Sequence, residues 1–315
     1  MTQALMSLSI LGGFLGAGKS TWLRHRLFEQ ADRPIILLNE MAEVAVDEYL
    51  LERAETLKVV AGGCACCERL DEFLAVLHEI CNDRTKDGRG EHPNRTILME
   101  TSGIAQPARI VRAILDDPVL KRHLRLESVI VAVDARNGFA RLLGDGLARS
   151  QVESADEIAL TKVDVCSPDD LADMIHLIGM LNPVAPVRAY AFGKEQQLPV
   201  MPSPRHVSFE FQSDDDPLCS VTLQLGENPV DPSDWHAFGA FMTALLHRHG
   251  GDLIRAKGVV ASSRGRLLFQ SVAGHVQPLE LLAGAPSESD NKVVLIGRRH
   301  QPERLAAAWQ RTRSL

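Results

Sequence analysis

The stretch that decides the fold is Gly13-Phe14-Leu15-Gly16-Ala17-Gly18-Lys19-Ser20, which has the pattern G-x-x-x-x-G-K-S. It stands between an apolar run, Leu5–Gly12, and a helical stretch, Thr21–Glu29. Backbone amides of such a loop hold phosphate oxygens, and the start of the following helix adds positive potential. A glycine-rich turn with a chance lysine is the alternative, and the flanking strand and helix disfavour it.

Two side chains of this loop have predicted chemical roles. Lys19 is expected to reach the β- and γ-phosphates and to act in catalysis, and the Ser20 hydroxyl is expected to ligate Mg²⁺. The nucleotide-binding residues predicted here are Gly13, Gly16, Ala17, Gly18, Lys19, Ser20 and Thr21.

Length and composition limit the class of protein. The chain has 315 residues, of which 45% are hydrophobic and 24% charged, so a large core in about two domains is expected. A net charge of −7, with both signs mixed, gives no footprint for nucleic acid. No apolar run approaches the roughly 20 residues that span a bilayer, and Met1–Ile10 reads as a first strand rather than a signal peptide. The six cysteines favour a reducing compartment, and we predict a cytoplasmic protein.

Strand and helix signals divide the chain into two predicted domains. Over residues 1–195 they alternate, which predicts an α/β fold with a mostly parallel sheet flanked by helices. A proline-containing linker is expected over Ala191–Pro204, followed by a smaller α+β domain over residues 205–315. Its strands are predicted at Val207–Phe211, Ser220–Leu225, Ile254–Ser262, Leu267–Val272 and Val293–Gly297, and its helices at Pro232–His249 and Pro302–Gln310.

Besides the Ser20 hydroxyl, an acidic group is needed to hold Mg²⁺ or its waters, and Glu100 is the candidate. It follows the short apolar run Thr96–Met99, and Glu100-Thr101-Ser102-Gly103 has the spacing of the D-x-x-G element of GTPases. The Gly103 amide would then sense the γ-phosphate, and its loop would move on hydrolysis. An ordinary turn after a strand is the alternative.

The base-reading element is predicted at Thr161-Lys162-Val163-Asp164, which resembles N-K-x-D with threonine in place of asparagine. The Asp164 carboxylate can accept two hydrogen bonds from guanine, and adenine offers no such pair of donors. The Lys162 stem can lie over the purine ring. An incidental surface turn is the alternative, which a late strand of a phosphate-loop domain makes less favourable.

Three thiols crowd into Gly62-Gly63-Cys64-Ala65-Cys66-Cys67. Thiolates this close repel one another unless a cation compensates, and soft sulfur ligands suit Zn²⁺ or Cu⁺. We therefore predict Cys64, Cys66 and Cys67 as metal ligands, with Glu43 as an added one, although solvation is the commoner role for a single carboxylate. Core or redox thiols are the alternative.

Together these motifs resemble the CobW-like GTPases, the metallochaperone branch of the P-loop GTPases. The likeness rests on G-G-F-L-G-A-G-K-S, N-E-x-x-E-V-x-x-D, G-C-x-C-C, E-T-S-G and T-K-V-D in this order, and on Gly251–Gly258, Leu268–Val272 and Val294–Arg298. It implies GTP hydrolysis to GDP with Mg²⁺, coupled to delivery of a transition metal, most often zinc, to a client protein. Assembly into a homo-oligomer is left open.

The sequence departs from the family pattern at some positions, and different functions compete with this one. Met41-Ala42 replaces the usual Phe-Gly, and Thr161 replaces the usual asparagine, which predicts looser guanine binding. Cobalt or iron delivery, for cobalamin synthesis or nitrile hydratase activation, would leave a similar sequence. A small-molecule kinase on the same fold and a non-catalytic zinc or redox sensor also compete, and Asp164 argues against the kinase.

Overall fold

A computed structural model describes residues 5–29, 33–40, 54–61, 70–86, 96–205, 209–211, 218–226, 230–249, 252–272, 274–285, 287, 290–299 and 301–314. The chain forms two compact units, Met1–Ser213 and Asp214–Leu315. Among the described residues, no helix has the length and apolar character needed to cross a membrane.

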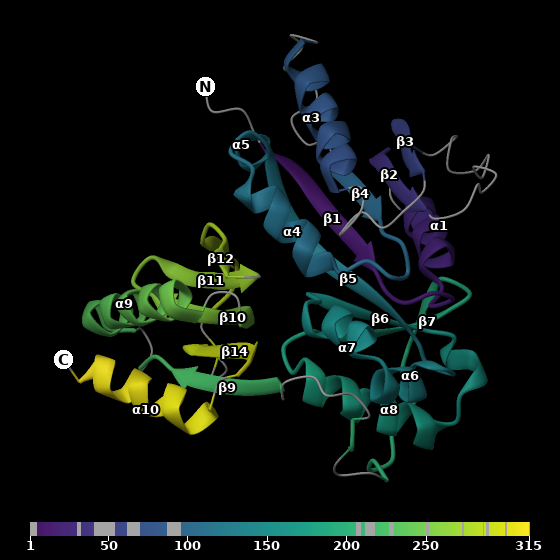
Figure 1. The fold of residues 1–315 in the computed structure, drawn as a ribbon. Coiled ribbons are helices and arrows are strands. Elements are labelled where there is room, and N and C mark those ends of the chain that lie inside the picture. Colours follow the sequence, from purple (N-terminus) through teal and green to yellow (C-terminus); the bar gives the residue numbers. More distant parts are fainter. Residues whose placement is uncertain are drawn as a thin grey trace. The chain divides into compact units, whose positions relative to one another are not determined.

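The first unit is built on one large sheet (Figure 1), whose strands run in the order β3-β2-β4-β1-β5-β6-β7-β8. Neighbouring strands are parallel except at the edge, where β8 is antiparallel to β7. Apolar runs form the central strands because a parallel sheet is buried on both faces. The strands are β1 (Met6–Gly12), β2 (Ile35–Glu40), β3 (Thr56–Ala61), β4 (Thr96–Glu100), β5 (Leu124–Asp134), β6 (Glu157–Thr161), β7 (Val187–Ala191) and β8 (Lys194–Gln196).

Helices flank this sheet, so the predicted α/β fold is confirmed. Trp22, Leu23 and Leu27 of the first helix pack with sheet residues such as Leu11 and Ile130. The Asp145 carboxylate caps α7, and the Ser167 hydroxyl caps α8. The helices are α1 (Lys19–Glu29), α3 (Leu70–Lys86), α4 (Pro107–Asp116), α5 (Leu120–His123), α6 (Gly138–Gly144), α7 (Gly146–Glu153) and α8 (Pro168–Leu181), with a 3₁₀ turn, η1, at Val163–Val165.

The first unit extends past residue 195 because the following stretch packs onto it. Arg205 donates from its side chain to Asp170 and Asp173 of α8, each over 2.7 Å. The Phe209 ring lies edge-on to Phe139 of α6, with centroids 5.6 Å apart. The expected linker, Ala191–Pro204, is also not irregular throughout, because residues 194–196 within it form strand β8. Of the strand expected at Val207–Phe211, residues 209–211 are described and have no strand structure.

The second unit is an antiparallel sheet with two helices, in agreement with the predicted α+β domain. The sheet has the order β12-β11-β10-β14-β9, and β13 pairs with β11. In its core, Phe238 makes edge contacts with the rings of Phe269 and Trp309. The elements are β9 (Leu218–Gln224), α9 (Pro232–His249), β10 (Leu253–Ser262), β11 (Gly265–Val272), β12 (His275–Val276), β13 (Glu280–Leu282), β14 (Lys292–Arg298) and α10 (Pro302–Arg313).

Four central strands of the first unit bring the predicted motifs to one edge. Strands β1, β4, β5 and β6 are parallel and end at Gly12, Glu100, Asp134 and Thr161. Ligands of open parallel sheets bind outside the carboxyl ends of the strands. The residues that follow these four ends are therefore the candidate site.

Candidate functional site

A cavity of about 540 Å³ lies at this edge of the sheet. Its lining comes mainly from three segments that are far apart in the sequence: the glycine-rich loop with the start of α1, the loop after β4, and the loop after β6. The lining residues are Leu15, Gly16, Gly18, Lys19, Ser20, Thr21, Leu38, Glu100, Thr101, Ser102, Gly103, Ile104 and Lys162.

The glycine-rich loop has a backbone that only glycine adopts easily. Gly13, Gly16 and Gly18 have φ values of 126°, 79° and 85°. A Cβ atom at Gly13 would lie 2.3 Å from the Ala132 carbonyl oxygen of β5, so the loop also needs glycine for close packing. Glycine-rich loops that lead into a helix present successive backbone amides to one concavity, which suits an anion.

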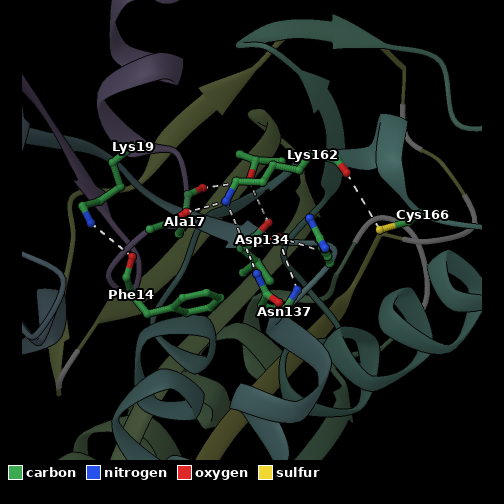
Figure 2. A network of polar contacts seen from close by, with 11 residues as sticks. Phe14, Ala17, Lys19, Asp134, Asn137, Lys162 and Cys166 are labelled. Atoms are coloured by element: carbon green, nitrogen blue, oxygen red, sulfur yellow. Dashed lines mark hydrogen bonds and ion pairs between the residues drawn. The ribbon is translucent and has the colours of Figure 1, made fainter.

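Lys19 is buried within this loop. Its ammonium group donates to the carbonyl oxygens of Gly13 and Phe14, over 2.9 and 3.2 Å. Figure 2 shows the Lys19 ammonium group directed toward the Phe14 carbonyl oxygen. These bonds hold the Lys19 ammonium group beside the backbone of the glycine-rich loop. This is the loop in which Lys19 was predicted to bind phosphate oxygens.

Ser20 and Glu100 meet across the cavity. The Ser20 hydroxyl donates to Glu100 Oε1 over 2.8 Å, although the two residues are 80 positions apart. The predicted magnesium pair is thus brought together. A hydroxyl and a carboxylate are hard oxygen donors, and Mg²⁺ in nucleotide sites uses one or two such ligands beside phosphates and water. The donor set therefore fits Mg²⁺.

The loop after β4 is clamped on both sides. Thr101 bonds the Leu11 carbonyl oxygen through its amide at 2.9 Å and its hydroxyl at 3.1 Å. Gly103 lies against the glycine-rich loop, because a Cβ atom there would be 2.6 Å from the Leu15 nitrogen. The fully buried Gln151 of α7 donates to the carbonyl oxygens of Gly103 and Ala105, over 3.2 and 2.7 Å. Sequence reasoning missed Gln151, since a single polar residue in a helix carries no recognisable signal.

Thr161 ties the loop after β6 to the glycine-rich loop. Its hydroxyl donates to the Ala17 carbonyl oxygen over 2.7 Å and lies 3.3 Å from that of Val133. The Thr161 side chain also packs close to Gly18, because a Cβ atom added at Gly18 would lie 3.4 to 3.5 Å from its hydroxyl and methyl groups. The threonine that replaces the usual asparagine therefore still makes a direct contact with the phosphate loop.

Lys162 makes a second tie between the same loops. Its ammonium group donates to the Gly16 carbonyl oxygen over 2.8 Å. It also pairs with the Asp134 carboxylate over 2.7 Å, as Figure 2 shows. The residue has a left-handed backbone, with φ of 58°, which turns the chain sharply after β6. Lys162 thus lines the cavity and fixes its shape.

Asp134 is a functional residue that sequence reasoning missed. It ends β5, is 2% exposed, and also accepts from the Arg136 amide and the Asn137 side chain. Burial alone would raise the pKa of Asp134, but the hydrogen bonds from Lys162, Asn137 and Arg136 hold it below the ordinary value. The signal was available, because a carboxylate directly after the apolar run Val129–Val133 stands at the ligand-binding edge.

Asp164 lies in the turn η1 and is exposed. Strand β7 packs against this turn. Asp164 does not line the cavity, whereas the nearby Lys162 does. Its role in reading the base stays a prediction. The predicted transition-metal ligands, Cys64, Cys66, Cys67 and Glu43, lie outside the described residues.

Both units of the chain match known protein families. The family model described as "CobW/HypB/UreG, nucleotide-binding domain" matches residues 7–189. The chain belongs to this CobW family. A second model, "Cobalamin synthesis protein cobW C-terminal domain", matches residues 226–313. The resemblance inferred from the motifs is therefore confirmed over both units.

Individual relatives of this CobW-family chain are zinc proteins by name. The zinc chaperone YjiA of Escherichia coli is 32% identical over 287 residues, covering 85% of this chain and 86% of YjiA. The zinc-regulated GTPase metalloprotein activator 1 of Schizosaccharomyces pombe is 28% identical, over 59% of this chain and 46% of that protein. A crystal structure of a zinc-bound triple mutant of the YjiA GTPase has a TM-score of 0.66 at 25% identity, covering 98% of this chain and 99% of that one.

Proposed function

We propose that this protein is a GTP-hydrolysing metallochaperone, which couples its nucleotide state to the binding of zinc and to zinc transfer to a client protein. The observation that carries the proposal is the pair of bonds from Thr161 to Ala17 and from Lys162 to Gly16. They join the phosphate loop to the loop that holds Asp164, so one nucleotide can contact both.

The residues around the cavity have distinct parts in this reaction. The amides of the glycine-rich loop and the Lys19 ammonium bind the β- and γ-phosphates. Ser20 and Glu100 hold Mg²⁺, which when bound neutralises negative charge that develops on the phosphates. Gly103 packs against Leu15 of the glycine-rich loop. Its amide binds the γ-phosphate, and loss of that phosphate releases its loop.

The cargo is supported by the cysteines and by the relatives. Cys64, Cys66 and Cys67 supply soft sulfur ligands, with Glu43 as a hard one, and the similar protein YjiA is named a zinc chaperone. In the sequence, the cysteines stand between the segment of Glu43 and the loop of Glu100–Gly103. Nucleotide-dependent movement of such loops changes which ligands converge on the metal. We place this activity in the cytoplasm, where thiols stay reduced.

A zinc titration in two nucleotide states tests the proposal. Zinc affinity is measured by competition with a chromophoric chelator, with GDP in one sample and a non-hydrolysable GTP analogue in the other. We expect the two affinities to differ by about 5- to 150-fold, the usual range for coupled sites. Equal zinc affinity in both samples contradicts the proposal, because the chaperone would then have no means of releasing its cargo.

Matched cysteine variants locate the zinc site in the same titration. Replacing Cys66 and Cys67 together with serine should remove tight zinc binding and leave GDP binding intact. Cys219→Ser is the control, because this partly exposed thiol belongs to β9 of the second unit. Zinc binding that survives the double replacement places the metal away from Cys66 and Cys67. Loss of zinc binding in the control would point to Cys219 instead.

A further inference from the structure

The hairpin between β7 and β8 carries an unusual residue at its tip. Ala191 pairs with Lys194, so Phe192 and Gly193 form a two-residue turn. Their φ values are 52° and 84°, the positive pair that defines a type I′ turn. Asparagine, aspartate or glycine normally fills the first of these positions, since a bulky side chain is strained there.

The Phe192 side chain is also 79% exposed. An aromatic ring in water gives the folded state little hydrophobic stabilisation. Phe192 is therefore unfavourable for the backbone and nearly unused in packing. Strained residues of this kind are often kept at ligand sites.

The turn packs against α1 next to a residue that lines the nucleotide cavity. A Cβ atom at Gly193 would lie 2.7 Å from the Thr21 carbonyl oxygen and 2.4 Å from the His25 ring, so the turn packs against the first two turns of α1. Thr21 lines the cavity. On the other side, β7 pairs with β6, placing Tyr190 opposite Thr161, and packs against the turn η1 that contains Asp164.

We propose that Phe192 is a stacking platform for the purine base of the nucleotide. The inference rests on the proposed function, because it adds a residue to the same site. Lys162 and Asp164 approach the base from the loop after β6, and Phe192 approaches it from the adjacent hairpin. A π-face binds any purine, so the ring adds affinity for the base while Asp164 selects guanine.

The decisive variant is Phe192→Asn, because it relieves the turn and removes the ring. We expect its melting temperature to equal or exceed that of the wild type. We expect GDP binding to weaken by about 5- to 100-fold, the range for loss of one aromatic stacking partner. Affinity for inorganic tripolyphosphate, which has no base, should change less than about twofold. Phe192→Trp should keep GDP affinity near the wild-type value.

The control is Phe28→Ala, which removes another exposed ring from the far part of α1 and should leave GDP affinity unchanged. Wild-type GDP affinity in Phe192→Asn overturns the stacking role and points to a protein partner for the exposed ring. Equal losses for GDP and tripolyphosphate also overturn it, since the turn would then only support the phosphate loop. Failure of the wild-type protein itself to bind GDP contradicts the proposed function instead.

Discussion

Replacement of Thr161 by valine tests how the base loop and the phosphate loop are joined. Valine has nearly the same shape as threonine but lacks the hydroxyl that donates to the Ala17 carbonyl oxygen over 2.7 Å. Thr161 is 6% exposed and Ala17 is fully buried, so water does not easily replace the lost donor. A buried acceptor left without a partner costs about 1 to 3 kcal/mol.

This cost should appear in the stability of the first unit and in nucleotide affinity. At about 2 kcal/mol, the expected fall in melting temperature is about 4 to 8 °C for a unit of this size. If about 1.4 kcal/mol of this cost destabilises the GDP-bound protein relative to the free protein, GDP should bind about tenfold more weakly. Calorimetry gives the first quantity, and titration with a fluorescent GDP analogue gives the second.

Two controls separate the hydrogen bond from other effects at Thr161. Thr161→Ser keeps the donor and loses only the methyl group that packs near Gly18, so it should stay closer to the wild type in both assays. Thr161→Asn restores the residue usual in the N-K-x-D element and should bind GDP at least as well as the wild type. If Thr161→Val melts and binds GDP like the wild-type protein, the bond does not join the loops and our reasoning is wrong.

Three further predictions concern single side chains. Lys19→Ala should abolish GTP hydrolysis and weaken GTP binding, and wild-type turnover in this variant would show that the loop is not the site. Asp164→Asn should shift preference from GTP towards XTP, whose 2-oxo group accepts a hydrogen bond; unchanged relative affinities would remove Asp164 from base reading. In the second unit, the hydrogen bond from Arg266 lowers the pKa of Asp290 from 3.8 to about 2, so about 1 to 2 kcal/mol of stability should be present above pH 4 and lost as the pH falls towards 2. Asp290→Asn should flatten this dependence in calorimetry between about pH 2 and 5, and an unchanged pH profile would refute it.

Local patterns were sufficient for much of the first unit. Short apolar runs predicted the central strands, and the glycine-rich loop followed from spacing alone. The meeting of Ser20 with Glu100 was also predictable, because Glu100 ends β4 and Ser20 follows the loop at the end of β1, the neighbouring parallel strand. Each of these features depends on one strand, or on one strand and the loop or helix that follows it, so a short stretch of sequence is enough to predict it.

Other features depend on contacts between distant segments. Gln151 acts through two carbonyl groups that are 46 and 48 positions away, and nothing in its helix distinguishes it from a surface glutamine. Arg205 binds Asp170 and Asp173 and fastens a stretch whose prolines resemble a linker. Phe192 is informative only once its turn geometry and exposure are known, since an aromatic residue near a strand end is otherwise unremarkable in a sequence.

The two residues at the end of β6 explain how the chain functions with threonine at position 161. An asparagine amide has two hydrogens and can donate to two carbonyl groups, whereas the Thr161 hydroxyl has one and is closer to Ala17 than to Val133. Lys162 adds a bond to Gly16, and the buried Asp134 holds its ammonium group in position. Two groups therefore bind the phosphate loop: the neutral Thr161 hydroxyl, and the Lys162 ammonium group that is paired with Asp134. The hydrogen bonds from Lys162, Asn137 and Arg136 lower the pKa of Asp134, so its carboxylate is ionised at neutral pH and can hold the Lys162 side chain in place.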